Sequence, residues 1–357
     1  MSSLPVTVGK IYQYVVGVDT HAATHAYAII NASTGALVDQ NQFPTSPAGL
    51  ARARDWIGRR TSGDLDGVLI SAEGTGSYGA LMSEGLAASG YRVVEAPTPR
   101  RGPDRRKTDD LDALLAARTT AALPLSVLRD RRAGQARAAL QVLATARERL
   151  NQERTAKRNA LNALVRSHDL GIDARRALSD GQVDQISAWR HRNESMDLQI
   201  ARGEAVRLAR GIQQLEVTLK DNEKQTRDLV RIVAPELLAV PGIKEVTAAV
   251  ILTAWSHPGR VRSESAFAML AGTAPIPASS GKTTRYRLNR GGDRRLNRAL
   301  HMIVLTRLNC DAKTREYVQR RRSEGKSDRD IRRCLKRFIS RQIYRLLAQH
   351  HPTPTTT

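Results

Sequence analysis

Short runs of hydrophobic residues alternate with amphipathic stretches over residues 12 to 122. Apolar residues two apart, or in short continuous runs, predict strands, whereas apolar residues three to four apart predict helices. Five segments are predicted to be strands: YQYVVGVD (12–19), THAYAIINA (24–32), ALVDQNQF (36–43), GVLISAE (67–73) and YRVVEA (91–96). Helices are predicted between them at 48–60 and from Tyr78 to Ala88.

The order of these elements predicts the fold class of the N-terminal region. Three strands in a meander, with a turn at Ser33–Gly35, precede helix, strand, helix, strand and helix. This is the order of an RNase H-like (RuvC-like) α/β domain, which we expect over residues 10–130. The stretch 96–108 is rich in Pro and Arg and predicts an irregular, exposed loop.

Residues 133–233 carry almost no strand signal and predict a long antiparallel coiled-coil segment. Apolar positions at alternating spacings of four and three residues are typical of a coiled-coil seam. The predicted seam comprises Leu208, Ile212, Leu215, Leu219, Asn222, Thr226, Leu229 and Val233. An earlier set is a candidate for its partner in a hairpin: Leu140, Leu143, Leu150, Leu161 and Leu164. We expect Asn222 to fix the register of the pair.

Residues 235–350 are rich in Gly and Arg and are predicted to form a mostly helical C-terminal domain. The segment LLAVPGIKEVTAAVIL (237–252) is similar to a helix-hairpin-helix motif. In that motif the turn formed by residues 241–243 offers backbone N–H groups to a DNA phosphate, so Gly242 and Lys244 are predicted to contact nucleic acid. An ordinary helix-start turn is the alternative.

The charge of the chain predicts a polyanionic partner. The 357 residues include 57 Lys and Arg against 35 Asp and Glu, a net charge of +22. Residues 282–350 alone contain 21 of the basic and 6 of the acidic residues. Nucleic acid is the simplest partner for such an excess. Aromatic residues are 4% of the chain, which argues against binding that relies mainly on base stacking.

The two cysteines, Cys310 and Cys334, indicate neither a disulfide framework nor a zinc site. The first residues lack the apolar core of a signal peptide, and no run approaches the length needed to span a bilayer. We therefore expect a soluble, cytoplasmic protein without a membrane partner.

Four acidic residues form a candidate metal site. Asp19 ends the first predicted strand and Glu73 ends the fourth, and these two strands lie side by side in an RNase H-like sheet. Asp109 and Asp112 start a predicted helix at a spacing that puts both on one face, while Asp110 points about 100° away. Converging carboxylates need compensation, which Mg²⁺ or Mn²⁺ supplies through oxygen ligands.

Each of these acids alone has a simpler interpretation. Asp109 could be an acid favoured by the helix dipole, and Asp19 a residue of a strand-end turn. The combination and its order along the chain favour the metal site. An actin-like nucleotide-binding fold also begins with a strand carrying G-x-D, but the further Gly-rich phosphate loops of that fold are missing from the sequence. His21 and His25 follow Asp19 closely; surface histidines are the favoured interpretation, and a role in orienting substrate or water is the alternative.

Five motifs occur in the order found in one family. These are VGVDTH (16–21), EGTGSY (73–78), KTDDLDA (107–113), AVPGIKEVTAAVIL (239–252) and PIPASSGKTTRYRLNRGGDRRLN (275–297). The chain resembles, over about residues 12 to 345, the Piv-type DEDD transposases of bacterial insertion sequences (the IS one-ten family). That family joins a RuvC-like domain, through a coiled coil, to a C-terminal transposase domain.

The resemblance implies site-specific recombination of double-stranded donor and target DNA, guided by a non-coding bridge RNA made by the element. It implies a nucleoid-associated location and Mg²⁺ (or Mn²⁺) held by Asp19, Glu73, Asp109 and Asp112. Recombination between two duplexes further implies a homodimer or homotetramer. Two interpretations stay beside it: a RuvC-type metal-dependent nuclease that resolves junctions without a covalent intermediate, and a non-enzymatic nucleic-acid-binding protein.

The family also uses a serine followed by glycine as nucleophile, which Ser280 fits and Ser279 nearly fits. This chain has SSGK and NRGGD where the family often has S-S-G-G-K and K-R-G-D, so the choice between the serines stays open. A serine needs an activating group, and no histidine is near in the sequence, so metal and cations are the remaining route. The candidate cations are Lys282, Arg285, Arg290 and Arg294. The alternative is a small polar loop that binds phosphate.

Overall fold

The computed structural model describes residues 5–97, 109–278 and 286–351. The chain divides into two compact units. Of the described residues, 5–97, 109–134 and 255–262 form unit 1, and 135–254, 263–278 and 286–351 form unit 2. Each unit is described by itself below. None of the helices within the described residues is both long and apolar enough to cross a membrane.

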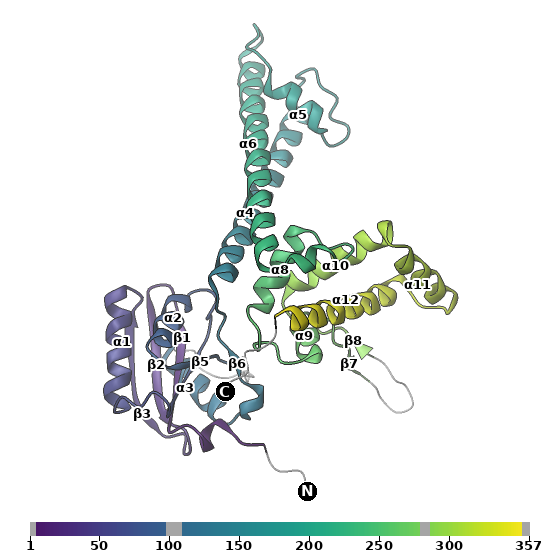
Figure 1. The fold of residues 1–357 in the computed structure, drawn as a ribbon. Helices are drawn as coiled ribbons and strands as arrows, with labels where there is room; N and C mark the ends of the chain where they lie inside the picture. The colour runs from purple at the N-terminus through teal and green to yellow at the C-terminus, as the bar shows by residue number, and fades with distance from the viewer. Residues whose placement is uncertain (1–4, 98–108, 279–285, 352–357) are drawn as a thin grey trace. The chain divides into compact units, whose positions relative to one another are not determined.

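Unit 1 is built on a six-stranded mixed sheet in the order β3-β2-β1-β4-β5-β6 (Figure 1). The first three strands form an antiparallel meander, and β4 and β5 run parallel to β1. The strands are β1 (Tyr14–Thr20), β2 (Thr24–Asn31), β3 (Leu37–Pro44), β4 (Val68–Ala72), β5 (Arg92–Glu95) and β6 (Arg129–Asp130). The predicted meander and the predicted pairing of the first and fourth strands are confirmed. The two-residue edge strand β6 was not predicted.

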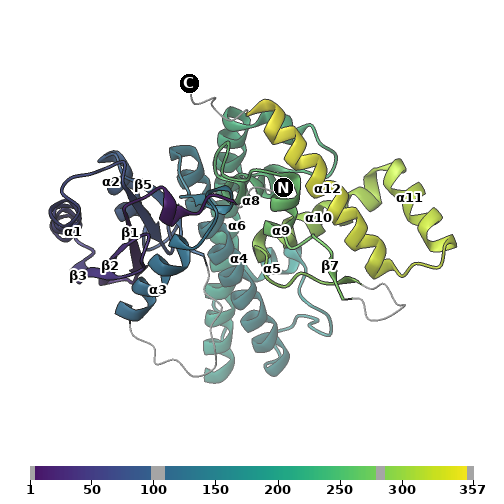
Figure 2. The ribbon, with the colours of Figure 1, turned by 90° about the horizontal axis from the view of Figure 1, so that it is seen from below.

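Helices cover both faces of this sheet (Figure 2). Helices α1 (Pro47–Arg60) and α2 (Ala80–Ala88) pack on one face, where Trp56, Ile57 and Leu86 join Val16 and Val18 in the larger core. Helix α3 (Asp109–Ala121) packs on the other face, where Ala117 and Ala121 contact Val15 and Leu69. A fully buried central strand explains why β1 and β4 are almost continuously hydrophobic.

Gly17 lets α3 approach the middle of β1 closely. A Cβ atom at Gly17 would lie 2.0 Å from the Ala113 carbonyl oxygen and 2.7 Å from the Ala117 nitrogen. Any larger residue would therefore push the helix away from the strand. Since side chains two apart on a strand share a face, Asp19 lies on the same face of β1 as Gly17, toward α3.

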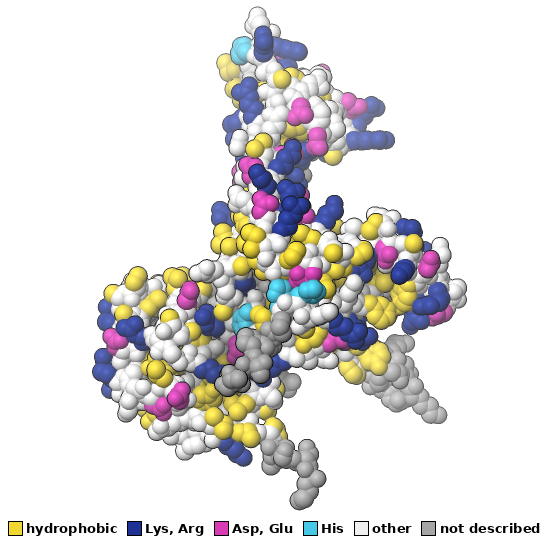
Figure 3. All heavy atoms as spheres, viewed as in Figure 1, with side chains coloured by type: hydrophobic (Ala, Val, Ile, Leu, Met, Phe, Trp, Pro, Cys, Tyr) yellow, Lys and Arg dark blue, Asp and Glu magenta, His cyan; other side chains and the backbone are white. Residues whose placement is uncertain are grey.

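Unit 2 begins with two long helices, α4 (Gln135–Ser167) and α6 (Met196–Val233), which pack side by side. Arg147 binds Glu223 and Arg158 binds Glu216, so the two helices run antiparallel. The buried residues of α6 include Leu208, Ile212, Leu215, Leu219, Asn222 and Thr226 of the predicted stripe. The stripe then continues at Val230, whereas Leu229 and Val233 are half-buried. Figure 3 shows many Lys and Arg side chains along this helical pair.

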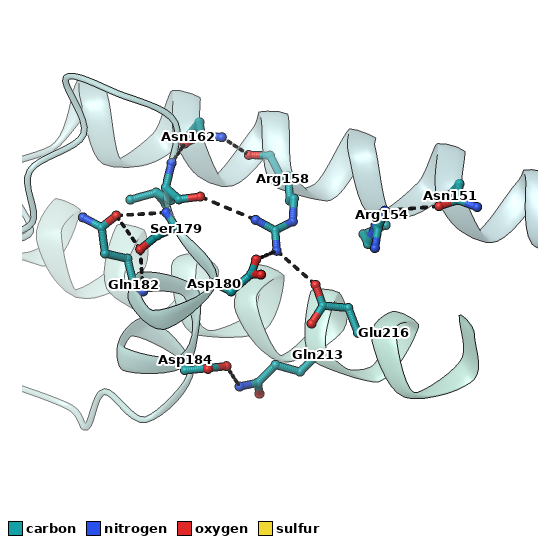
Figure 4. A network of polar contacts seen from close by, with 11 residues as sticks. Asn151, Arg154, Arg158, Asn162, Ser179, Asp180, Gln182, Asp184, Gln213 and Glu216 are labelled. Carbon is teal, nitrogen blue, oxygen red and sulfur yellow. Dashed lines mark hydrogen bonds and ion pairs between the residues drawn. The ribbon is translucent and has the colours of Figure 1, made fainter. Parts of the chain in front are cut away.

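Buried polar groups tie the helical pair together. Asn222 is 6% exposed and its Nδ2 donates to the Leu143 carbonyl of α4 at 3.0 Å. Arg158 reaches Asp180 and Glu216 and so joins α4 to α6 and to the short helix α5 (Asp180–Ser187), as Figure 4 shows. Ser179 caps α5, since its hydroxyl accepts from the Gln182 N–H while the Gln182 side chain accepts from the Ser179 N–H. These hydrogen bonds and ion pairs join α4, α5 and α6.

The other described residues of unit 2 form helices and one pair of short antiparallel strands. Its elements are α7 (Pro235–Leu238), α8 (Glu245–Trp255), α9 (Glu264–Leu270), β7 (Ile276–Pro277), β8 (Tyr286–Arg287), α10 (Arg294–Cys310), α11 (Ala312–Ser323) and α12 (Asp328–His350). Helices α10, α11 and α12 each begin at a capping side chain, which accepts a hydrogen bond from an N–H of the first turn: Asp293, Asp311 and Ser327. The predicted mostly helical C-terminal region is confirmed.

Candidate active site

Asp19 lies at the end of β1, where the sheet meets the start of α3. It is 8% exposed. Burial raises the pKa of its carboxyl group, His21 lowers it, and the negative charges of Asp112 and Asp109 raise it further, with a net upward shift. A bound cation stabilises the ionised form of a carboxylate most strongly where other acids surround it and raise its pKa. Asp112 and Asp109 thus lie close enough to Asp19 for their charges to raise its pKa.

Asp109 and His21 complete a cluster around Asp19. His21 Nδ1 lies 3.6 Å from Asp19 Oδ2, and its Nε2 lies 3.7 Å from Asp109 Oδ1. One donor atom from each of the three residues lies within 4.8 Å of the other two. Two carboxylates and an imidazole nitrogen fit a divalent cation, with the oxygen donors that Mg²⁺ and Mn²⁺ prefer. The His21 side chain is 49% exposed, as predicted for a surface histidine, and its imidazole lies beside both carboxylates.

Glu73 follows β4 directly, next to the end of β1. Its backbone N–H donates to the Val18 carbonyl at 3.0 Å, and the Thr20 hydroxyl donates to the Glu73 carbonyl at 3.3 Å. These two bonds hold the Glu73 backbone beside the strand that carries Asp19. The structure thus brings the backbone of Glu73 to the edge where Asp19 and Asp109 meet.

Asp110 serves a different purpose from its neighbours in the first turn of α3. Its Oδ1 accepts a hydrogen bond from Gln42 Nε2 of β3 at 2.9 Å. The side chain is therefore directed to β3, as its helical position relative to Asp109 and Asp112 predicts. Asp110 offers a matched control for substitutions in the cluster.

His25 is buried rather than exposed, so its prediction as a surface histidine is wrong. It is 1% exposed and lies opposite Thr20 in the β1–β2 ladder. Burial lowers the pKa of His25. An imidazole that is buried in the sheet has no access to substrate.

Glu95, at the end of β5, was not recognised as a special residue in the sequence. It accepts hydrogen bonds from Arg260 (2.6 Å), Arg132 (3.0 Å) and the Thr75 hydroxyl (3.2 Å). Burial raises the pKa of Glu95, but the two arginines and the hydrogen bonds outweigh it and lower the pKa overall. Thr75 lies two residues after Glu73, so Glu95 anchors the loop that carries Glu73. Its position as a carboxylate at a strand end, like Asp19, was the available signal.

Replacing Arg260 with Met is expected to lower the free energy of unfolding by about 3 kcal/mol, because Glu95 would remain buried with one arginine fewer. The Arg260 side chain is 2% exposed. Urea unfolding followed by circular dichroism measures the change. Arg54→Met, which removes an exposed pair with Asp55, is the control and should cost less than about 1 kcal/mol. Equal losses in both variants would contradict the anchoring role.

The Glu95–Arg260 ion pair also predicts how the difference in unfolding free energy between wild type and Arg260→Met depends on pH. Since the folded-state pKa of Glu95 is lowered from 4.5, its contribution is present above that value and is lost as the pH falls through the lowered pKa. The gap between wild type and Arg260→Met should therefore narrow in acid.

The predicted nucleic-acid contacts fall in unit 2. A turn is present at residues 241–243, where the Ile243 N–H donates to the Val240 carbonyl and Gly242 has φ +80°. Lys244, Arg290 and Arg294 are exposed. Ser279, Ser280, Lys282 and Arg285 lie outside the described residues.

Two family models match the chain. One, described as "Transposase IS116/IS110/IS902 family", matches residues 234–319. The other, named for the DEDD transposases of IS110 and described as "Transposase", matches residues 16–168. Together they cover about two thirds of the chain, including every acid of the cluster.

Two curated proteins are similar to parts of the chain. The "Insertion element IS900 uncharacterized 42 kDa protein" of Mycobacterium paratuberculosis is 29% identical over 165 residues, 44% of this chain and 41% of that protein. The "Insertion element IS110 uncharacterized 43.6 kDa protein" of Streptomyces coelicolor is 34% identical over 95 residues, 26% of this chain and 24% of that protein. The matched part thus spans less than half of either relative.

Proposed function

Because the chain belongs to the IS116/IS110/IS902 family of transposases, we propose that it cuts and rejoins double-stranded DNA to move an insertion element. The observation that carries the proposal is the approach of Asp109 to Asp19, with His21 bridging them, at the end of a buried strand. This arrangement supports a divalent-cation site in a fold unit that the family shares. The basic surface of unit 2 supports a nucleic-acid substrate.

We assign the metal ligands to Asp19, Glu73, Asp109 and Asp112, with Mg²⁺ as the ion and Mn²⁺ as its substitute. A bound ion of this kind neutralises charge on phosphate oxygens and favours the ionised form of a nucleophile. Asp19 contributes an oxygen donor at the end of a rigid strand, and α3 contributes the two acids on one helical face. Thr75 and Glu95 hold the loop that presents Glu73.

In this proposal Ser280 is the nucleophile. Its Oγ forms a bond to phosphorus while the bond from phosphorus to the leaving deoxyribose oxygen breaks. The hydroxyl proton passes to water, and the leaving oxygen takes up a proton from water. The transient phosphoserine–DNA linkage conserves bond energy for rejoining. Lys282, Arg285, Arg290 and Arg294 are assigned to neutralising the phosphate.

The proposed partners and organisation follow the family resemblance. They are donor and target DNA, a bridge RNA that supplies sequence specificity, and further copies of the chain in a homodimer or homotetramer. We propose three functional segments, a RuvC-like domain at 10–130, a coiled coil at 133–233 and a transposase domain at 235–350. Within the last, the turn at Gly242 and Lys244 is assigned as a helix-hairpin-helix contact to DNA backbone.

Purified protein with its co-purified RNA is expected to join a donor and a target plasmid in Mg²⁺. Chelation with EDTA should abolish the joined product, and added Mn²⁺ should restore it, because the acids need a hard cation. Sequencing across the junction detects the product. Treatment with ribonuclease before the assay tests the role of the RNA. If joined product still forms after this treatment, the RNA is not required, and only the recombinase part of the proposal remains. Product formation in EDTA would refute the metal site.

A further inference from the structure

A basic groove with exposed aromatic side chains lies beside the β7–β8 hairpin in unit 2. It is an open cavity of about 500 Å³. One wall is formed by residues 272–275 and 286–289, and the other by Lys326 and the first turns of α12. The hairpin strands bracket the sequence segment that contains Ser279 and Ser280. Figure 3 shows basic and hydrophobic side chains next to one another in this part of the surface.

The charge of the groove favours an anion. The charged residues that line it are Arg287, Lys326, Asp330, Arg333, Lys336 and Arg337. Only one of the six is acidic, and it binds Arg333 at 3.1 Å. Arg337 binds Glu264. Within the described residues, Arg287 and Lys326 form no ion pair and are exposed to solvent. Two uncommitted cations therefore face the groove.

Lys336 is a half-buried cation whose hydrogen bond goes to a neutral group. Its Nζ donates to Asn297 Oδ1 at 3.0 Å, and no carboxylate of the described residues pairs with it. Burial, followed by the charge of Arg333, lowers its pKa. Lys336 and Arg332 also lower the pKa of His301 after burial. The positive charges around Lys336 therefore repel one another, and a bound phosphate group would offset this repulsion.

Flat apolar side chains stand beside these cations. Tyr286 is 59% exposed and Phe338 is 47% exposed, and both line the groove. Phe338 packs edge-to-face on Tyr317 of α11 at 5.6 Å between ring centroids. The guanidinium groups of Arg320 and Arg321 lie 5.6 and 5.9 Å from the Tyr317 ring. Exposed aromatic rings next to arginines are the combination that stacks on unpaired bases.

We propose that this groove binds an unpaired nucleotide of a nucleic-acid strand. The phosphate contacts Lys326, Lys336 and Arg287, and the base stacks on Tyr286 and Phe338. A paired base cannot offer its face to a side chain, so the site selects single strands over duplexes. The inference rests on the proposed function only in taking nucleic acid as the partner. The same chemistry is available from an unwound DNA strand or from an RNA, and the test separates these sources.

The two cysteines of the chain provide the readout. Cys334 lines the groove and is half-buried, whereas Cys310 ends α10 and is exposed. Modification of both thiols with N-ethylmaleimide is followed by mass spectrometry, with oligothymidine, oligouridine or duplex DNA present. We expect either single strand to slow modification of Cys334 while Cys310 reacts unchanged, and the stronger protector identifies the source. Equal protection by duplex DNA would overturn the proposal.

Variants of Tyr286 test the stacking contact. Tyr286→Ala is expected to weaken single-strand binding about 5- to 100-fold, and Tyr286→Phe, which keeps the ring, is expected to bind like wild type. Fluorescence anisotropy measures binding, and the high exposure of Tyr286 spares the fold. Equal affinity of the Ala and Phe variants would overturn the base contact.

A variant of Lys336 tests the phosphate contact. Lys336→Gln is expected to weaken single-strand binding and to reduce the salt dependence of that binding. Arg175→Gln, which removes an exposed charge next to Asp173, is the control.

All these measurements use the Asp109→Asn background, so that binding is read without cleavage. Protection of Cys334 with no recombination by the wild type would leave the groove standing and refute the proposed function. Recombination by the wild type without protection of Cys334 would refute the groove alone.

Discussion

Asp109→Asn is expected to reduce DNA cleavage about 100-fold or more, whereas Asp110→Asn is expected to cleave at nearly the wild-type rate. The two residues are adjacent in the first turn of α3 and undergo the same chemical change. Asp109 lies in the cluster with Asp19 and His21, while Asp110 binds Gln42 on β3. Only the first substitution removes a charged oxygen donor from the proposed metal site.

The measurement is single-turnover cleavage of a labelled DNA substrate in Mg²⁺, together with an anisotropy assay for DNA binding. Both variants should bind DNA as the wild type does, since neither changes the basic surface of unit 2. Similar losses in the two variants would mean that the start of α3 acts through structure rather than through a ligand. Full cleavage activity of Asp109→Asn would show that Asp109 is not a metal ligand. Loss of DNA binding by Asp109→Asn would favour the interpretation as a non-enzymatic nucleic-acid-binding protein.

Ser280→Ala is expected to abolish the covalent protein–DNA adduct, and Ser279→Ala is expected to retain it. A hydroxyl removed from the attacking position leaves no atom to bond with phosphorus, so adduct should fall at least about 1,000-fold, as it does when a nucleophile is deleted. Denaturing electrophoresis after quenching the reaction separates the linked DNA from free strands. The control for folding is unchanged DNA binding by both variants.

The pattern of adducts also distinguishes the reaction classes. Loss of adduct in Ser279→Ala alone would move the nucleophile by one residue. Cleavage with no adduct in the wild type, together with its loss in Asp109→Asn, would favour the RuvC-type nuclease that uses metal-dependent hydrolysis alone. Both outcomes leave the carboxylate cluster as the source of the chemistry.

Local patterns were sufficient to predict most elements and to single out Asp19 and Asp109, two members of the cluster. The continuous hydrophobic runs of β1 and β4 and the three-residue spacing of Asp109 and Asp112 can be recognised from neighbouring residues alone. The separate direction of Asp110 follows from the same rule and is confirmed by its bond to Gln42. In α6 the sequence pattern predicted Leu229 in the buried stripe, but Val230 is buried instead. Which of the two faces the interior depends on how α6 packs against α4.

The remaining features depend on residues far apart in the chain. His21 joins the cluster because Gly17 allows α3 to lie against β1, and His25 is buried because the β1–β2 ladder places it inside. Glu95 and Arg260 are 165 residues apart and meet only when residues 255–262 pack within unit 1. Neighbouring residues carry no information on such pairings, whose free energy comes from burial and hydrogen bonding after the chain has closed. The groove around Lys336 has the same origin: its cations and aromatic rings come from β8 and α12, more than 40 residues apart, and become one surface only in the folded chain.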